Sequence, residues 1–191
     1  DIELPYGITS IASQTFAACH NLSSIVIPNS VTSIQNDAFA SCTSLTSIVI
    51  PNSVKTIGNS ILKNCKALTS ITFPNSITKI GNNICDDCYS LVSITWNAIQ
   101  CADAISFSPF ADIANQITSF TFGENVEYIP SRLCDNMTNL TSITIPKSVT
   151  NIGNSAFEGC TSLNSVTYTG NVASWCNIKF GNSSANPIYY S

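Results

Sequence analysis

The chain has 191 residues, of which 9% are charged, and its formal net charge at pH 7 is -4. An ordinary soluble domain carries roughly 25% charged residues, so serine, threonine and asparagine must supply most of the polarity of a nearly uncharged surface. The seven cationic residues are scattered singly, which argues against a nucleic-acid partner, and the absence of an apolar run of about 18 residues argues against membrane insertion.

A repeat of 23 residues organises the chain. Cysteines recur in one column at this interval, and a leucine follows each of them three residues later. These cysteines are Cys19, Cys42, Cys65 and Cys88. After Leu91 the next equivalent residue is Ile117, 26 residues on, and the spacing of 23 then resumes. We therefore interpret residues 97–116 as an irregular repeat with a three-residue insertion.

Each repeat opens with the pattern L-x-S-I-x-I, which predicts a short β-strand. The leucine and the two isoleucines would face inward, because side chains alternate between the two faces of a strand. The serine and the residue two places after it would face outward and form two columns along a sheet. The outward columns are Ser24, Ser47, Ser70, Ser93, Ser119, Ser142 and Ser165, and Val26, Val49, Thr72, Thr95, Thr121, Thr144 and Thr167.

A proline follows the strand in several repeats and ends the ladder, because it has no N–H to donate. A second buried pair comes next, as in Val54 and Ile57, and a residue such as Phe39 then fills the far side. No single unit can bury these side chains alone, so neighbouring units must stack at about 4.8 Å, the spacing of parallel strands. We expect a right-handed, mostly β solenoid of about eight coils, with one parallel sheet and short turns or 3-10 segments opposite.

The pattern resembles the BspA-type leucine-rich repeat. The resemblance rests on the segment LTSIVIPNSV, on recurring Ile-Gly pairs and on the Phe-x-x-Cys spacing of Phe39 and Cys42. It covers nearly the whole chain and departs at residues 97–116 and 170–191, where the second segment resembles an irregular terminal repeat of the family. We expect residues 1–191 to form a single leucine-rich-repeat domain, either complete or as a fragment of a longer protein.

The resemblance also carries expectations about location and role. Members of this family are secreted and surface proteins of bacteria and some parasitic protists, so the resemblance implies an extracellular or cell-surface location and adhesion or binding to a host protein. No export signal opens the chain at Asp1, so the sequence itself does not give the location.

The nine cysteines could indicate disulfides or a metal site, but five of them share one inward column. Side chains stacked at about 4.8 Å are farther apart than the roughly 3.8 Å between the Cβ atoms of a disulfide, so we expect mostly free thiols. Cys85 and Cys88 form a CxxC, but both fall in inward columns, which favours core residues over redox or metal chemistry. Cys101 and Cys176 lie in irregular repeats and are the best candidates for a bond, if one exists.

Other candidates for chemistry have simpler explanations. His20 is the only histidine and is expected to be a solvent-facing turn residue. A set of carboxylates near the thiol column could attract a cation, but their spread over separated repeats favours a solvated edge. These are Asp86, Asp87, Asp135 and Glu158. No phosphate loop, HExxH or GxSxG motif occurs, so we predict no enzymatic activity, no cofactor and no metal site.

Our leading hypothesis is a module that binds a host or matrix protein, in which the hydroxyl face supplies area and the irregular repeat supplies identity. The candidate contact residues on the face are Ser47, Ser70, Ser93, Ser119, Ser142, Thr72, Thr95, Thr121 and Thr144. In the irregular repeat they are Phe107, Pro109, Phe110 and Asp112. An equally strong interpretation is that these aromatic residues repack the core around a longer loop.

The main alternative is a structural spacer that holds another domain away from a cell surface. Both end coils are expected to lack a polar cap, so they would continue in a longer protein or associate end to end. A remote third hypothesis is ice binding by the stacked hydroxyls, but leucine-rich-repeat stacks usually curve, which spoils the match to a lattice.

Overall fold

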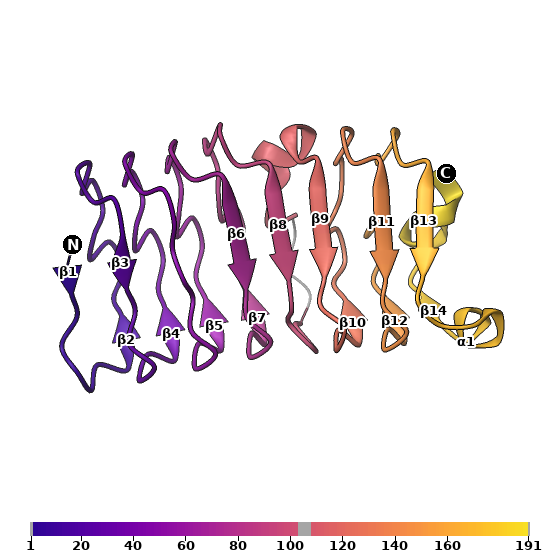
Figure 1. Cartoon of the computed structure of the whole chain (residues 1–191), viewed down its shortest axis with the longest axis horizontal. Helices are drawn as coiled ribbons and strands as arrows, with labels where there is room; N and C mark the ends of the chain where they lie inside the picture. Colours follow the sequence, from indigo (N-terminus) through magenta and orange to yellow (C-terminus); the bar gives the residue numbers. More distant parts are fainter. Residues whose placement is uncertain (1, 103–107, 191) are drawn as a thin grey trace.

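Each repeat forms one coil of a solenoid, and successive coils stack along the long axis of the molecule (Figure 1). The computed structural model describes residues 2–102 and 108–190. The N-terminus lies at one end of the stack and the C-terminus at the other, so residues one repeat apart in sequence are neighbours in space. The expected solenoid of parallel strands is confirmed.

A first ladder of parallel strands contains the L-x-S-I-x-I segments. Equivalent residues are in register, since Ser70 pairs with Ser93 and Ser93 with Ser119. In the coil of residues 45–67 the pairing is reduced to a bridge between Val26 and Val49. The strands are β1 (Ile2–Glu3), β3 (Ile25–Val26), β6 (Ser70–Phe73), β8 (Ser93–Trp96), β9 (Ser119–Phe122), β11 (Ser142–Ile145) and β13 (Ser165–Tyr168).

A second ladder follows the proline turn, which corrects the expectation of one sheet. Each strand contributes two residues, an outward polar residue and an inward isoleucine or phenylalanine. The irregular repeat keeps this side continuous, because Ala102 N–H donates to Thr78 O at 2.9 Å and Tyr128 N–H donates to Ile99 O at 3.1 Å. The strands are β2 (Ser10–Ile11), β4 (Ser33–Ile34), β5 (Thr56–Ile57), β7 (Lys79–Ile80), β10 (Tyr128–Ile129), β12 (Asn151–Ile152) and β14 (Lys179–Phe180).

A third side of each coil consists of turns that also bond to the next coil. Phe16 N–H donates to Ala38 O and Phe39 N–H donates to Ile61 O, both at 2.9 Å. Two residues per regular coil have left-handed backbone, with φ between 55° and 72°, a region that asparagine and aspartate tolerate better than most residues. They are Gln14, Asp37, Ser60, Asn83, Arg132 and Ser155 in one column, and Ala18, Ser41, Asn64, Asp87, Asn136 and Gly159 in the other.

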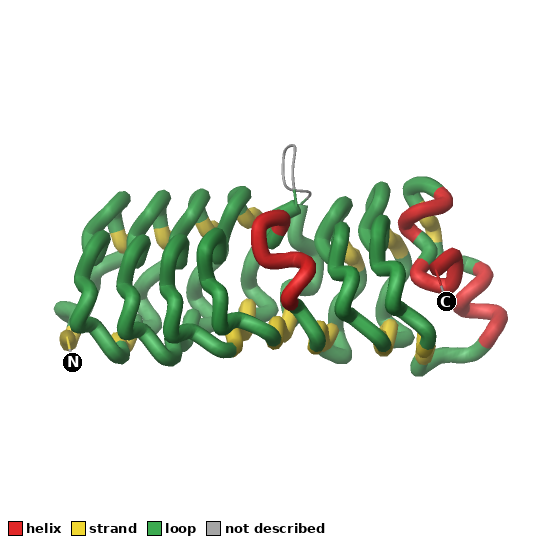
Figure 2. The backbone as a smooth tube through the Cα atoms, turned by 90° about the horizontal axis from the view of Figure 1, so that it is seen from above, coloured by secondary structure: helices red, strands yellow, loops and turns green. Residues whose placement is uncertain are grey.

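Helical segments replace the turns in the two irregular repeats. The 3-10 helix η1 (Ala111–Gln116) lies on the outer side of the irregular coil, where neighbouring coils have turns (Figure 2). After β13 come α1 (Val172–Cys176), η2 (Ser183–Ala185) and η3 (Pro187–Tyr190). Asn171 begins α1 with a capping box: its Oδ1 atom accepts from the Ser174 backbone N–H at 2.8 Å, and the Ser174 hydroxyl accepts from the Asn171 backbone N–H at 3.2 Å.

The core runs along the axis of the stack. Its leucine column is fully buried at Leu45, Leu68 and Leu91, and the inward isoleucines of both ladders pack against it. Phe16 and Phe39 stack with ring centroids 5.4 Å apart, so the aromatic column joins neighbouring coils as well as filling each one. The buried side chains therefore form one continuous interior.

Candidate functional site

The first ladder presents the expected hydroxyl face. In β6, Ser70 and Thr72 are exposed, whereas Ile71 and Phe73 are buried. The same alternation holds along the ladder, because parallel in-register strands place equivalent side chains above one another. The predicted contact residues are exposed at Ser47, Ser70, Thr72, Ser119, Thr121, Ser142 and Thr144, and half-buried at Ser93 and Thr95.

This face is almost uncharged. Among the described residues of the two outward columns, the one charged side chain is Glu3, which pairs with Val26 at the N-terminal end. The hydroxyls can both donate and accept hydrogen bonds, so the face can match polar groups of either kind without adding charge.

The irregular repeat differs from the expected contact loop. Phe110 is fully buried, with its ring centroid 5.6 Å from that of Phe73 and 6.4 Å from that of Phe120, so its assignment to partner contact is wrong and it repacks the core. Pro109 is buried as well. Phe107 lies outside the described residues.

Asp112 remains accessible in the irregular repeat. Its side chain is exposed, and its Oδ2 atom accepts a hydrogen bond from the backbone N–H of Asp87 at 3.2 Å. It lies on η1, at the side of the coil that carries the turns, rather than on the hydroxyl face. The structure therefore does not bring Asp112 together with the serine and threonine columns.

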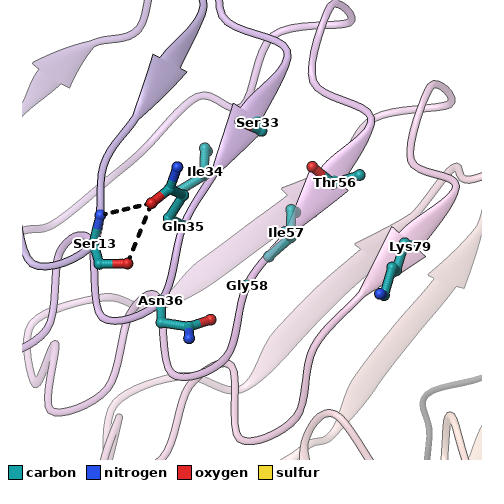
Figure 3. Close-up of a pocket in the computed structure, with 9 residues that line it drawn as sticks. All are labelled: Ser13, Ser33, Ile34, Gln35, Asn36, Thr56, Ile57, Gly58 and Lys79. Atoms are coloured by element: carbon teal, nitrogen blue, oxygen red, sulfur yellow. Dashed lines mark hydrogen bonds between the residues drawn. The ribbon is translucent and has the colours of Figure 1, made fainter.

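A groove on the second ladder was missed by sequence reasoning (Figure 3). It has a volume of about 440 Å³, and its outward lining includes Ser33, Thr56 and Lys79. At one end Ser13 and Gln35 point toward one another, and the backbone N–H of Ser13 donates to Gln35 Oε1 at 3.2 Å. The lining offers hydroxyl, amide and ammonium groups to a polar ligand.

A related groove recurs around Lys179, near Tyr128, Asn151 and Gly153. Lysines at equivalent positions of β7 and β14 were the available sequence signal for both grooves. The signal was weak, because two-residue strands do not produce a visible alternation.

Glycine shapes this second side. A Cβ atom on Gly58 would lie 2.5 Å from Asn36 Oδ1 and 2.6 Å from the backbone nitrogen of the same residue. Asn36 Oδ1 accepts from Asn59 N–H at 2.8 Å, and Asn59 Oδ1 accepts from Asn82 N–H at 2.9 Å. Glycine recurs at Gly58 and Gly81 because the asparagine of the preceding coil occupies the space where a side chain would lie, and Ser131 occupies the same space beside Gly153.

No disulfide joins any of the nine cysteines, as expected for most of them, so Cys101 and Cys176 are not bonded to one another. Buried thiols of the repeat column donate to backbone carbonyls of the preceding coil, as Cys42 does to Phe16 O at 3.2 Å and Cys160 to Cys134 O at 3.1 Å. Burial raises the pKa of Cys42 to about 11 and that of Cys160 to about 12. These thiols therefore stay protonated near neutral pH and serve as weak hydrogen-bond donors.

The two cysteines of the CxxC motif are core residues, and the histidine lies at the surface. Cys85 and Cys88 are both buried, and burial raises the pKa of the Cys85 thiol. His20 is exposed, with Nδ1 3.0 Å from Ser41 O. Among the described residues, no group of three or more histidine, cysteine, aspartate or glutamate side chains is placed to hold a metal ion.

Carboxylates occupy one position in four successive coils, two residues before the thiol column. The expectation that these carboxylates are solvated is wrong for two of them, because Asp86 is only 8% exposed and Asp135 only 7%. Burial raises the pKa of both, and the neighbouring carboxylates add to the effect. Asp135 is compensated by an ion pair with Arg132 at 3.1 Å, whereas Asp86 has a buried Oδ1 atom without a hydrogen-bond partner. The column is Asp86, Asp112, Asp135 and Glu158.

Six copies of the family model described as "BspA type Leucine rich repeat region" match the chain, over residues 1–112 and 99–187. The chain belongs to this family. Three solved structures are also similar to it. A leucine-rich repeat protein of Treponema pallidum is 26% identical, and the match covers 87% of this chain and 68% of that protein with a TM-score of 0.53.

The other two structures show likeness of fold. The Eubacterium ventriosum leucine-rich repeat protein is 22% identical over 85% of this chain and 43% of its own, with a TM-score of 0.69. The Bacteroides ovatus leucine-rich repeat protein is 21% identical, and the match covers 96% of this chain and 57% of that protein with a TM-score of 0.56. The chain thus spans between 43% and 68% of these three proteins. No curated protein matches it significantly.

The BspA-type family is surface-associated, and leucine-rich-repeat solenoids generally mediate protein binding rather than catalysis. In the described part of the chain, no helix is long and apolar enough to cross a membrane.

Proposed function

We propose that this chain is a non-enzymatic, extracellular protein-binding module that contacts a host or matrix protein through the first-ladder face. The observation that carries the proposal is a neutral surface on which serine and threonine side chains stack in register, coil after coil. The surface association of the family supports the location, and its solenoid fold supports binding.

The chemistry of the face defines how it would bind. Short hydroxyls give many weak contacts and lose little side-chain entropy on binding, so affinity would come from area and close fit. Because these columns are almost without charge, we expect affinity to change little between low and high salt, unlike that of an electrostatically steered interface.

The decisive experiment places charge on the face without disturbing the coils. Thr121→Lys combined with Thr144→Lys adds two ammonium groups to exposed positions of β9 and β11. The matched control, Thr56→Lys with Asn151→Lys, adds the same charge to the second-ladder column, which already contains Lys79 and Lys179. Affinity is measured by surface plasmon resonance against a panel of purified extracellular-matrix proteins.

We expect the first-ladder variant to weaken binding at least tenfold, because the partner must desolvate two unpaired charges, while the control keeps the affinity of the parent protein. Equal effects of the two variants, or none from either, would contradict binding through this face.

A spacer function is the second candidate, and the uniform repeat favours it. Coils of 23 residues stack in one register, so length can vary by whole units without changing local structure. A spacer would retain its activity after removal of one coil, whereas a binding face would lose contact area.

A further inference from the structure

Two valines interrupt the outward columns of the first ladder. Val26 and Val49 occupy the column that carries threonine in the five coils that follow, and their side chains are 73% and 74% exposed. The bridge between them places the two side chains next to one another. Valine and threonine have nearly the same shape, so the column keeps its form here and loses its hydroxyls.

An open groove of about 750 Å³ surrounds this pair. The buried residues Ile50 and Pro51 contribute to its lining, and the exposed residues Asn29 and Asn52 add side-chain amides. No charged residue lines it. An apolar centre with polar groups at its margin is the usual composition of a protein-docking centre.

The same two coils are also less well bonded than later ones. Ser76 Oγ donates to Val54 O and Ser148 Oγ donates to Val126 O, both at 2.6 Å. The equivalent hydroxyls of Ser30 and Ser53 are buried without a partner. A buried hydroxyl without a partner destabilises the fold, because it gives up its hydrogen bonds to water and gains none in return.

The strand pairing is also sparse at this place. β3 has two residues and the next coil contributes only the bridge at Val49, whereas β6, β8, β9, β11 and β13 have four residues each. Exposed apolar side chains, unpaired hydroxyls and weak pairing thus coincide in two adjacent coils. Local departures from a consistent design are expected at functional sites.

We propose that the Val26–Val49 pair is the docking centre of the first-ladder face and receives an uncharged apolar side chain from an extended segment of the partner protein. This inference rests on the proposed function. An extended segment fits because the amides of Asn29 and Asn52 can donate to and accept from its backbone. An apolar side chain fits because the two valines and the buried Ile50 and Pro51 form the centre of the groove.

The first test uses a defined probe. An uncharged heptapeptide with a central phenylalanine is titrated into protein with ¹³C-labelled valine methyl groups, next to the same peptide with a central alanine. We expect the methyl resonances of Val26 and Val49 to shift and saturate at millimolar peptide with phenylalanine, and at least tenfold less binding with alanine. Shifts scattered over the valines of the chain would overturn the proposal.

The second test removes the apolar character alone. Val26→Thr with Val49→Thr restores the repeat pattern, and Thr9→Val with Thr161→Val, at exposed positions outside the two outward columns, is the control for the exchange of valine and threonine. We expect the first pair to weaken both peptide binding and partner binding at least tenfold with a melting temperature within a few degrees of the parent, and the control to leave peptide binding unchanged.

Four outcomes count against the docking centre. Loss of stability with unchanged affinity would make the valines a structural contact, and a dimer in light scattering that disappears in the threonine variant would make a second copy the occupant. If the lysine variants weaken partner binding and the threonine variants do not, this inference fails while the proposed function stands. If neither set changes binding, both fail.

Discussion

At the scale of single residues, Asp86 is a carboxylate that the fold buries with incomplete hydrogen bonding. Asn83 Nδ2 donates to its Oδ2 atom at 2.7 Å, but Oδ1 is buried without a partner. Burial raises the pKa of Asp86; the Asn83 hydrogen bond opposes the shift and Asp112 adds to it. A raised pKa means that the folded state binds the proton more tightly than the unfolded state. The associated stability is therefore present below the unfolded pKa and is lost as pH rises through the folded one.

Asp86→Asn should therefore stabilise the protein at pH 7, where the native carboxylate is charged. We expect a gain on the order of 1 kcal/mol, or about 2–4 °C in melting temperature for a chain of this size, shrinking toward pH 3.5. Thermal unfolding followed by circular dichroism at both pH values measures it. Glu124→Gln removes an exposed carboxylate and is the control for net charge. A gain that is independent of pH, or equal to that of the control, would refute the role of burial.

The cysteines show which residue-scale features sequence could predict. Five share a repeat column, and the column alone implied an inward side chain and free thiols, as the structure has them at Cys42, Cys65, Cys88 and Cys160. Asp86 and Asp135 also belong to a column, but its first two members are Ala17 and Ala40. Their burial depends on neighbours within the coil, which periodicity does not report.

At the scale of elements, the asparagine–glycine contact fixes the bend after the second ladder. Gly58 and Gly123 differ in which atoms an added Cβ would contact. On Gly58 it would approach the side chain of Asn36 and also its backbone nitrogen, at 2.6 Å. On Gly123 it would lie 2.4 Å from Asn97 Oδ1 but 3.3 Å from the nearest backbone atom, Asn97 Cα.

Gly58→Ala should therefore destabilise the protein more than Gly123→Ala, by about 3 against about 1 kcal/mol. Asn97→Ala should rescue Gly123→Ala, because the obstructing atoms belong to a side chain, while Asn36→Ala should leave most of the Gly58→Ala effect in place. Urea unfolding of the single and double variants gives the two coupling energies. Equal rescue in both pairs would show that backbone contact does not limit the bend.

The first ladder could be predicted from sequence and the second could not. Four to six residues of alternating character, as in Leu68 to Phe73, identify a strand and its inward face. Two residues such as Thr56 and Ile57 carry no alternation, so the second strand shows only after the coil has closed. Phe110 was ambiguous for a related reason: an insertion changes the register, and only packing against Phe73 and Phe120 decides its direction.

One part of the candidate binding face could likewise be predicted from sequence, and another part could not. The hydroxyl columns follow from alternation along the first ladder, and the structure places them on one face. The groove beside Val26 and Val49 depends on how adjacent coils meet, and the bridge and its neighbouring asparagines cannot be read from one repeat.

At the scale of the whole molecule, stability is a sum over contacts between neighbouring coils, because successive coils pack and hydrogen-bond along the second ladder and the turns and over parts of the first ladder. The number of coils can therefore change without changing the fold of each coil. Deleting residues 45–67 joins Ser44 to Leu68 and recreates the sequence around Ser44 and Leu45, so both ladders stay in register. Deleting residues 45–66 leaves one extra residue and shifts the following strand by one position, which would turn its inward face outward.

The shorter protein made by the first deletion should give the same far-UV circular dichroism spectrum per residue as the parent protein and unfold in a single transition. Its urea m value should fall by roughly one eighth, in proportion to the surface that unfolding exposes. The one-residue mismatch of the second deletion should lower the midpoint by much more, because the register error would expose a leucine column that is fully buried in the parent. Similar midpoints for the two deletions would mean that the turns absorb register errors. Stacking of equivalent residues would then not be what holds the coils together.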